Sequence, residues 1–294
     1  MKSGFVSLIG RPNVGKSTLL NAIVGEKIAI TSPTAQTTRN MIQGIYNDED
    51  LQIIFVDTPG IHKPQNKLGH ILNKQAYYNI DDVDVILFLT DVTKNLGTGD
   101  SFIIEKLKET KVPVILVLNK IDKIPYESIL PKIQEYKDLY DFKEIIPISA
   151  YKKKNIEDLI KTVSNYLTDD IKYFDDDTIT NVSTSFSISE LIREKVLLLT
   201  KEEVPHSTTC IIEDISEDKY NISIGASIIV DRDNLKKILI GKNGTMIKKI
   251  GVEARRDIEK LLNKKVFLDL RVKVVDNWRE KEQFLNQLGY EDFK

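Results

Sequence analysis

Short apolar runs divide the first half of the chain. They cover residues 5–9, 53–56, 85–89, 114–118 and 145–148, and several are apolar at almost every position. A strand that is apolar throughout is typical of a parallel sheet covered on both faces. Helix-length stretches lie between the runs. The pattern therefore predicts a doubly wound, mostly parallel α/β domain, whose ligands should bind at the carboxyl ends of the strands.

An amphipathic stretch and an acidic stretch mark the end of this domain. Apolar residues recur at helical spacing from Ile156 to Leu167, which predicts a closing helix. Residues 169–177 are acidic and have no clear period, so we assign them to a linker region. We place the first domain at residues 1–170, the linker at 171–184 and a second domain at 185–294.

The second half has a different order of elements. The order helix–strand–strand–helix–helix–strand, followed by a final helix, predicts a small α+β domain. We expect a helix over 188–200, strands over 208–215 and 220–230, a helix over 235–240, a longer helix through about Leu262, a strand over 266–274 and a helix near 278–288.

Composition narrows the class of protein. A chain of 294 residues with 41% hydrophobic and 29% charged residues suits two soluble domains. No stretch reaches the roughly 18 apolar residues of a membrane span, and we expect no signal peptide. The single cysteine, Cys210, excludes a disulfide framework and a multi-cysteine zinc site. We expect Cys210 to be a small buried residue on a strand, and the protein to be cytoplasmic.

Charge is unevenly distributed along the chain. The net charge is only −2, but the segment from Arg232 to Lys273 holds 13 Lys and Arg against 5 Asp and Glu. A local excess of positive charge in a nearly neutral chain suggests that the second domain meets a polyanion.

The first of four ordered motifs follows the run at residues 5–9. Its residues, Gly10-Arg11-Pro12-Asn13-Val14-Gly15-Lys16-Ser17, fit the phosphate-binding pattern G-x-x-x-x-G-K-[ST]. In such a strand–loop–helix unit, backbone N–H groups and the helix dipole form a site for the β- and γ-phosphates of a nucleotide. Lys16 should neutralise charge on these phosphates, and the Ser17 hydroxyl should bind Mg²⁺. Thr18 is included in the predicted nucleotide site.

The second motif, Asp57-Thr58-Pro59-Gly60, ends the run at residues 53–56. A carboxylate in this position can hold Mg²⁺ through water, and the Gly60 N–H can sense the γ-phosphate. The nucleotide site is expected to include Ile61 as well. Residues 34–39 lie between the first helix and the next strand, where a switch loop belongs. We expect Thr38 to give the second Mg²⁺-binding hydroxyl, with Thr37 as its competitor.

The last two motifs select the base. Asn119-Lys120-Ile121-Asp122 follows the run at residues 114–118, and Ser149-Ala150 follows the last one. The Asp122 carboxylate can accept hydrogen bonds from guanine N1–H and N2–H₂, and adenine would leave it unpaired. Asn119 is expected to brace the phosphate loop, Lys120 to pack along the base, and the Ala150 N–H to donate to guanine O6. The four motifs together predict a GTP-binding protein.

One departure from the common pattern concerns hydrolysis. Ras-like GTPases carry a glutamine after the glycine of the second motif to position the attacking water, but this chain has Ile61. His62 could substitute or could be a plain loop histidine. Asn13 offers a better hypothesis, because GTPases with this asparagine bind K⁺ beside the phosphates. We therefore expect K⁺ stimulation and name Lys16, Asn13, Thr38 and Gly60 as catalytic residues.

The second domain carries one further motif, Gly241-Lys242-Asn243-Gly244, between two predicted helices. This is the arrangement of a type II KH domain, in which such a loop clamps single-stranded nucleic acid. Lys242, Lys248 and Lys249 would add charge for phosphates. The bases should lie in an apolar groove between a helix and a strand edge, walled by Ile240, Ile247 and Val230.

Taken together, these motifs and the short linker to a KH domain resemble the Era family of bacterial GTPases. The resemblance extends over essentially the whole chain, including Gly251-Val252-Glu253-Ala254-Arg255 and Leu288-Gly289-Tyr290. It implies a GTPase that binds the 3′ end of small-subunit (16S) ribosomal RNA in its GTP state and assists small-subunit assembly. It also implies Mg²⁺ as cofactor and a peripheral contact with the inner membrane, and we expect a monomer.

Two other functions stay open at this point. One is an RNA-binding scaffold whose nucleotide domain hardly turns over, for which Ile61 is the warning sign. The other is a related K⁺-stimulated GTPase that acts on tRNA, which the lack of an additional cysteine-bearing or cofactor-bearing domain disfavours. Asp122 disfavours an ATPase.

Overall fold

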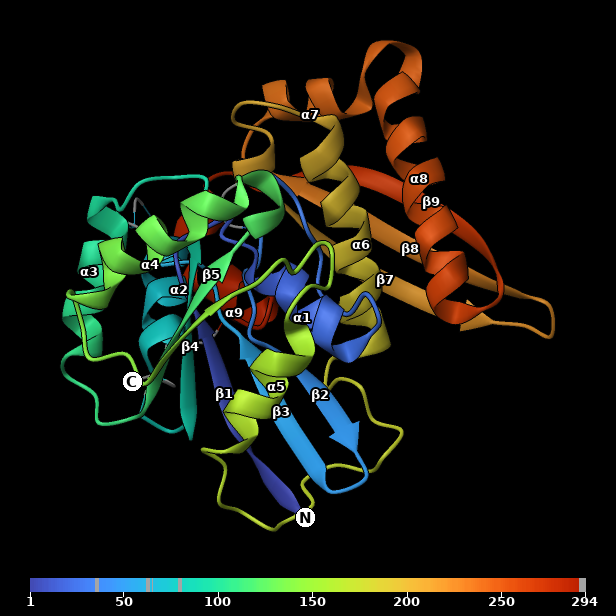
Figure 1. Ribbon diagram of the computed structural model, residues 1–294. Helices are drawn as coiled ribbons and strands as arrows, with labels where there is room; N and C mark the ends of the chain where they lie inside the picture. Colours follow the sequence, from blue (N-terminus) through green and yellow to red (C-terminus); the bar gives the residue numbers. More distant parts are fainter. Residues whose placement is uncertain (35–36, 62–63, 65, 79–80, 291–294) are drawn as a thin grey trace.

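The computed structural model describes residues 1–294 except 35–36, 62–63, 65, 79–80 and 291–294. The chain forms two domains joined by an extended segment, with the first domain in blue to yellow-green and the second in yellow to red (Figure 1). Among the helices within the described ranges, none is both long enough and apolar enough to cross a membrane.

The first domain is built on a six-stranded sheet in the order β2-β3-β1-β4-β5-β6. Strand β2 pairs antiparallel with β3, and the other neighbours are parallel, which confirms the predicted doubly wound fold. Strand β2 itself was not predicted, because this edge strand lacks a continuous apolar run. The strands are β1 (Lys2–Ile9), β2 (Ile42–Asp48), β3 (Leu51–Asp57), β4 (Val85–Asp91), β5 (Val114–Asn119) and β6 (Glu144–Pro147).

Helices cover both faces of this sheet. Helices α1 (Lys16–Val24) and α5 (Ile156–Ser164) pack on one face, and α2 (Lys67–Tyr78), α3 (Thr98–Leu107) and α4 (Ile129–Lys137) pack on the other. Successive residues of β4 alternate between the two cores. Because both faces are buried, each position of such a strand favours an apolar side chain, which explains the continuous runs in the sequence.

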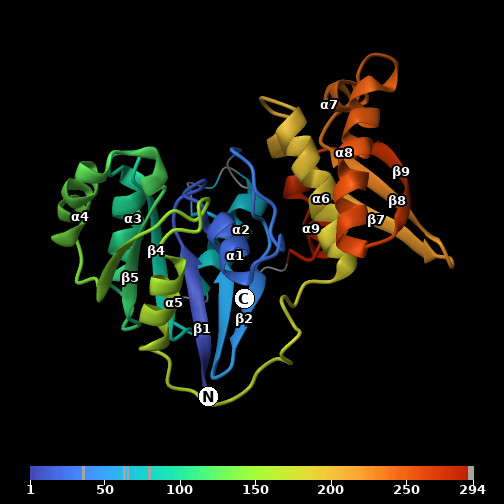
Figure 2. The ribbon, with the colours of Figure 1, turned by 45° about the vertical axis from the view of Figure 1, so that its right-hand side comes forward.

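The segment between the domains follows the edge of the first sheet (Figure 2). The side-chain oxygen of Gln52 in β3 accepts hydrogen bonds from the N–H groups of Tyr173 and Phe174, at 2.7 and 3.0 Å. Further along, the Ile45 N–H donates to the Ile179 carbonyl at 3.0 Å, and Thr180 Oγ1 donates to the Gln43 carbonyl at 2.7 Å. The segment predicted as a linker is therefore docked along the sheet.

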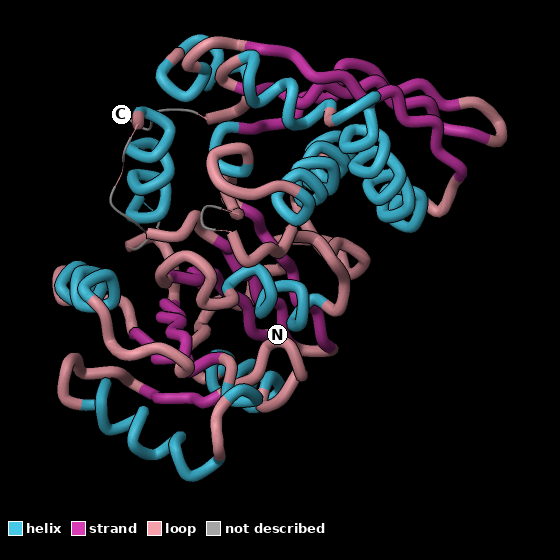
Figure 3. The backbone as a smooth tube through the Cα atoms, turned by 90° about the horizontal axis from the view of Figure 1, so that it is seen from above, coloured by secondary structure: helices cyan, strands magenta, loops and turns pink. Residues whose placement is uncertain are grey.

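The second domain has a three-stranded sheet in the order β7-β8-β9, with β7 antiparallel and β9 parallel to β8. Helices α6 and α8 lie on one face of this sheet (Figure 3), where their apolar residues and those of α7 form the core. The order of elements is the predicted one. They are α6 (Thr184–Leu199), β7 (Thr208–Glu217), β8 (Asn221–Val230), α7 (Asp233–Ile240), α8 (Thr245–Leu262), β9 (Lys265–Val274) and α9 (Glu282–Gln287).

The C-terminal elements fill the space between the domains. The predicted single helix near residues 278–288 is a short 3₁₀ turn, Trp278–Glu280, followed by α9. Leu68, Ile71 and Leu72 of α2 pack with Trp278, Leu285 and neighbouring apolar residues of the second domain. Trp278 is fully buried, and its indole N–H donates to the Ser207 carbonyl at 3.0 Å. The opposite face of the second sheet is thereby joined to the first domain.

Candidate functional site

The phosphate loop, residues 10–15, joins β1 to α1 at the carboxyl edge of the sheet and lines a pocket of about 670 Å³. Gly15 has φ 105°, and a Cβ there would collide with the side-chain amide of Asn119. That amide donates to the Val14 carbonyl at 2.9 Å, so Asn119 lies where the predicted bracing role needs it. Glycine is required here both by the backbone and by this close approach.

Lys16 begins α1 and is almost completely buried. Its ammonium donates to the carbonyls of Gly10 and Arg11, at 3.1 and 3.3 Å, and therefore points along the loop. Burial lowers the pKa of Lys16, and the Asp57 carboxylate opposes this shift. A phosphate in the pocket would stabilise the charged form of Lys16 in the same way, which is what the predicted role requires.

Three side-chain oxygens converge beside Lys16. Ser17 Oγ lies 2.6 Å from Asp57 Oδ2 and 2.8 Å from Thr38 Oγ1, and Thr38 Oγ1 lies 3.3 Å from Asp57 Oδ2. Asp57 Oδ1 is buried and has no hydrogen-bond partner within the described ranges. Burial raises the pKa of Asp57, against the effect of Lys16. Mg²⁺ prefers hard oxygen ligands, so this oxygen set fits the predicted metal.

Thr38, and not Thr37, is part of this oxygen cluster. Thr37 Oγ1 donates to the Thr34 carbonyl at 2.7 Å and lies 2.7 Å from Ser32 Oγ, so its hydroxyl is engaged within the switch loop. Gly60 packs directly against the phosphate loop, because a Cβ there would lie 3.0 Å from the Pro12 backbone. The position of Thr38 suits the predicted contact with Mg²⁺, and the position of Gly60 suits the predicted contact with the γ-phosphate.

A smaller pocket of about 260 Å³ lies at the base-reading end, between Asn119 and Tyr151. Asp122 Oδ1 accepts a hydrogen bond from Ser149 Oγ at 2.5 Å, which orients the carboxylate. The Ala150 N–H, which we predicted to meet guanine O6, donates to Asn119 Oδ1 at 3.0 Å. This amide therefore has a protein partner and would have to share its hydrogen with the base.

The other residues predicted for the nucleotide site either support it from the protein interior or line its pocket. The side chains of Val14, Ile61 and Ile121 are buried in the apolar cores, so only their backbones can face a nucleotide. Thr58 Oγ1 donates to the Leu8 carbonyl, and Arg11 forms an ion pair of 2.7 Å with Asp100. Pro12, Asn13 and Thr18 line the large pocket. His62 lies outside the described residues.

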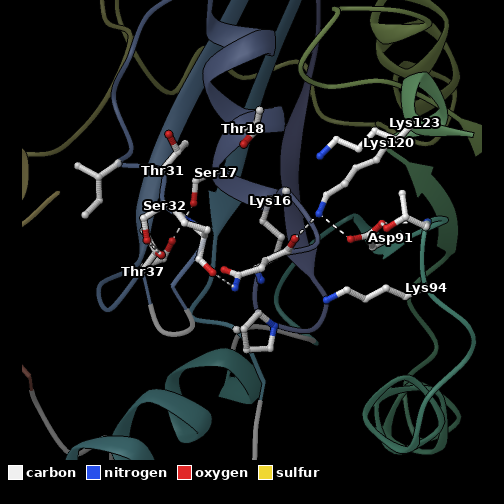
Figure 4. Close-up of a pocket in the computed structure, with 18 of the residues that line it drawn as sticks. Lys16, Ser17, Thr18, Thr31, Ser32, Thr37, Asp91, Lys94, Lys120 and Lys123 are labelled. Carbon is white, nitrogen blue, oxygen red and sulfur yellow. Dashed lines mark hydrogen bonds and ion pairs between the residues drawn. The ribbon is translucent and has the colours of Figure 1, made fainter. Parts of the chain in front are cut away.

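The pocket also contains side chains that the sequence analysis did not name, among them Lys94, Lys123, Thr31 and Ser32. Figure 4 shows the amines of Lys94 and Lys123 beside that of Lys120 on one side, and the hydroxyls of Thr31 and Ser32 beside that of Thr37 on the other. The Lys120 ammonium lies 2.6 Å from both Asp91 Oδ2 and the Asn13 carbonyl.

A signal for Asp91 was present in the sequence, since it ends the apolar strand β4 as Asp57 ends β3. Burial would raise the pKa of Asp91, but hydrogen bonds from Lys120 and Thr93 outweigh it, and the net shift is downward. Asp91 is therefore a charged anchor for Lys120. Leu198 of α6 also lines the pocket, and no local pattern could have placed it there.

The clamp motif forms a short 3₁₀ turn, Lys242–Gly244, between α7 and α8. Gly244 has φ 76°, and a Cβ there would meet no atom within 4 Å, so the backbone is open to a ligand. Lys242, Asn243, Lys248 and Lys249 are exposed, and the predicted phosphate contacts are sterically available to them.

A groove of about 360 Å³ runs between α8 and β9, the edge strand of the second sheet. Ile247 lines it as predicted, whereas Ile240 packs against the domain core. The prediction that Val230 forms a wall was wrong. Val230 ends the central strand β8 and is fully buried. Residues that line the groove but were missed include Gly251, Val252, Arg255, Phe267 and Leu270.

Comparison with known proteins finds relatives of both domains. Residues 5–120 match the family described as 50S ribosome-binding GTPase, and residues 203–279 match the KH domain family. Two solved structures are each 43% identical to this chain, cover 99% of both chains and superpose with a TM-score of 0.95. One is Era in complex with MgGDPNP and nucleotides 1506–1542 of 16S ribosomal RNA. The other is a point variant of Aquifex aeolicus Era bound to GDP.AlF4⁻.

Identity at this level over the whole length, together with a phosphate loop, a guanine-reading tetrad and a KH clamp in one chain, leaves one assignment. The chain belongs to the Era family of GTP-hydrolysing enzymes, in which a P-loop domain precedes a KH domain.

Proposed function

We propose that this GTPase binds the 3′ end of small-subunit ribosomal RNA in its GTP state, releases it after hydrolysis, and thereby assists assembly of the small subunit. The observation that carries the proposal is the groove between α8 and β9 next to the Gly241–Gly244 clamp, whose Lys242 and Asn243 are exposed. The similar Era structure with a 16S ribosomal RNA segment supports the choice of RNA.

Each part of the nucleotide site has a distinct task in this scheme. The loop N–H groups and Lys16 bind the phosphates, and Ser17, Thr38 and Asp57 would hold Mg²⁺, which neutralises charge on the β- and γ-phosphates. The Gly60 N–H would donate to the γ-phosphate. When hydrolysis removes the γ-phosphate, the contacts that would order the switch loop around Thr38 are lost, and the loop can move.

The groove suits single-stranded RNA chemically. Phe267 is 66% exposed at its rim and offers a flat face on which a base can stack. Ile247, Val252 and Leu270 provide apolar walls, and Lys248 and Arg255 provide charge for the backbone. The lack of a Cβ at Gly244 lets a phosphate approach the clamp backbone closely.

The test is a binding experiment with full-length protein and a short RNA copied from the 3′ end of small-subunit ribosomal RNA. Affinity is measured with a non-hydrolysable GTP analogue and with GDP, and a scrambled RNA is the control. We expect tight, sequence-selective binding with the analogue only. Equal affinity in both nucleotide states would refute the switch, and no preference over scrambled RNA would refute the target.

We also propose that K⁺ stimulates hydrolysis. Asn13 adopts a left-handed backbone conformation, lines the pocket and donates from Nδ2 to the Pro33 carbonyl at 2.6 Å, which places its amide between the phosphate loop and the switch loop. A cation there would balance charge that develops during hydrolysis. We expect faster turnover in K⁺ than in Na⁺, and loss of the difference in Asn13→Ala. Equal rates in both salts, unchanged by the substitution, would contradict this.

Three further expectations follow from the family. We propose that the protein is a cytoplasmic monomer, that it acts on the small ribosomal subunit, and that it contacts the inner membrane peripherally. Light scattering checks the monomer, co-sedimentation with small subunits checks the partner, and flotation with anionic vesicles checks the membrane contact. If the protein does not sediment in the same fraction as the small subunits, the second expectation is contradicted.

A further inference from the structure

Helix α6 of the second domain contacts the first domain just before the switch loop, at Thr31, and within it, at Thr37. Glu194 Oε1 accepts a hydrogen bond from the Thr31 N–H at 3.0 Å. Arg193 Nη2 donates to the Thr37 carbonyl. The two contacts lie on either side of Ser32 to Thr34, so one helix of the RNA-binding domain holds the chain before and within the switch loop, where it lines the nucleotide pocket.

The Arg193 side chain is fixed in position by burial and by an ion pair. It is only 1% exposed, and its guanidinium forms a two-point ion pair with Glu190, at 2.7 and 2.6 Å. Burial would lower the pKa of Arg193, but the Glu190 carboxylate outweighs it, so the group stays charged. A planar guanidinium held by two bonds to one partner has little freedom left, and its third contact is therefore well defined in space.

The other side of Thr38 is anchored to the same domain. Arg39 is also 1% exposed, and its Nη1 donates to the Thr208 carbonyl at 2.6 Å. Its guanidinium carbon lies 5.7 Å from the ring centre of Trp278. Thr38 thus stands between two residues, Thr37 and Arg39, that are both tied to the second domain, and its own hydroxyl reaches Ser17 in the first.

We propose that Arg193 is a positioning residue of the nucleotide site: by holding the Thr37 carbonyl, it keeps the Thr38 hydroxyl beside Ser17 and Asp57. The second domain then contributes to the affinity for GTP and Mg²⁺, although Arg193 is not among the residues that line the nucleotide pocket. The inference rests on the predicted role of Thr38 in the proposed function. GDP lacks the γ-phosphate that draws the switch loop toward the metal, so its affinity should depend little on Arg193.

The experiment measures binding of a fluorescent, non-hydrolysable GTP analogue and of fluorescent GDP to the full chain, with Mg²⁺ and with EDTA. The variants are Arg193→Met and the double variant Glu190→Met/Arg193→Met, since the double variant leaves no uncompensated charge in the interface. We expect both to bind the analogue about tenfold more weakly in Mg²⁺, because one charged hydrogen bond is lost. GDP binding, and analogue binding in EDTA, should change less than about twofold.

Two controls separate the inference from its premise. Thr38→Ala should reproduce the same selective loss, and Glu282→Gln should behave as wild type, since it breaks a more exposed interdomain ion pair, Lys67–Glu282, away from the switch loop. If Thr38→Ala binds both nucleotides normally, the premise fails and the inference fails with it. If only Thr38→Ala shows the loss, or if the Arg193 variants lose GDP and analogue equally, Arg193 has no positioning role.

Discussion

At the scale of single residues, charged side chains with defined partners fix the loops around the pocket. Lys16 and Asp57 are both buried and oppose each other's pKa shifts. Lys120 ties the phosphate loop to Asp91, and Asp122 is oriented by Ser149. A buried charge is costly unless it is paired, so Lys16, Asp57 and Asp91 should tolerate few replacements. Asp122 is exposed, so a change there should alter base recognition rather than stability.

Asp122→Asn should change the nucleotide preference and leave the fold intact. The substitution replaces a carboxylate oxygen by an N–H₂ group, which faces the guanine donors with another donor, and Ser149 Oγ can still pair with the remaining oxygen. We expect GTP affinity to fall by at least about 100-fold. Xanthosine triphosphate, which carries an oxygen in place of the guanine amino group, should bind better than GTP. Competition binding measures both affinities.

An unchanged preference for GTP in Asp122→Asn would show that the base is read elsewhere. Ser149→Ala is the matched control. It removes the hydroxyl that orients Asp122 but keeps the carboxylate, so it should weaken GTP binding and leave the preference for guanine as it is.

Residue chemistry was predictable where a motif fixes both the residue type and its place at the end of a strand. Lys16, Asp57 and Asp122 therefore lie where the sequence placed them. Orientation was less predictable: the Val230 prediction failed because the sequence does not say which of the three strands of the second sheet is central. Leu198 was missed because its place in the pocket depends on how the domains pack.

At the scale of elements, helix α6 has an apolar face that packs in the second domain and a charged face that contacts the first domain. Its apolar residues Ile188, Ile192 and Val196 pack in the core of the second domain. The consecutive charged residues Arg193, Glu194 and Lys195 are buried against the switch loop, Lys27 and Asp257. Apolar periodicity revealed the helix, but a run of three charges usually marks a solvated surface, so the polar interface could not be predicted from pattern alone.

The pH dependence of this interface follows from Glu194. Burial would raise the pKa of Glu194, but hydrogen bonds from Lys27, Lys195 and the Thr31 N–H outweigh it, and the net pKa is lowered from 4.5. A lowered folded-state pKa means stability that is fully present above the unfolded-state value and is lost as the pH falls through the folded-state value. The interface should therefore loosen only below pH 4.5.

Trp278, the only tryptophan in the chain and fully buried between the domains, reports this loosening by its fluorescence. Urea unfolding at pH 7 should show Glu194→Gln to be less stable than wild type, and the difference should shrink toward about pH 3. Glu109→Gln, which breaks an exposed ion pair with Lys106, is the control and should change neither curve. A difference between Glu194→Gln and wild type that persists at acid pH would contradict the assignment.

At the scale of the whole molecule, the apolar cores of the two domains are joined by a further apolar cluster around Trp278 and by the polar contacts of α6. The sequence predicted both domains, because each carries its own pattern of strands and helices. It could not predict their mutual arrangement, which depends on Arg39, Arg193 and α2 meeting partners far away in the chain.

Asp57→Ala should uncouple the two domains. It removes the carboxylate between Ser17 and Thr38, so the GTP state can no longer order the switch loop that α6 contacts. We expect RNA affinity measured with the GTP analogue to fall to the level measured with GDP, which should itself stay unchanged. Fluorescence anisotropy with labelled RNA measures both. Lys242→Glu, a clamp variant, should weaken RNA binding in both nucleotide states; nucleotide-dependent RNA binding that survives in Asp57→Ala would refute the coupling.

The docked linker has a consequence for how far the domains can separate. A free chain between α5 and α6 would be about 19 residues long and could span roughly 60 Å. Hydrogen bonds instead hold it to the first sheet as far as Thr180 and Asn181, and Ser183 already caps α6. The free tether is thus about two residues, so α6 stays near the switch loop at an effective concentration on the order of millimolar even when their contacts break. The contacts between α6 and the switch loop can therefore each be weak and still re-form quickly. An interdomain contact that breaks and re-forms in each cycle of GTP binding and hydrolysis requires this property.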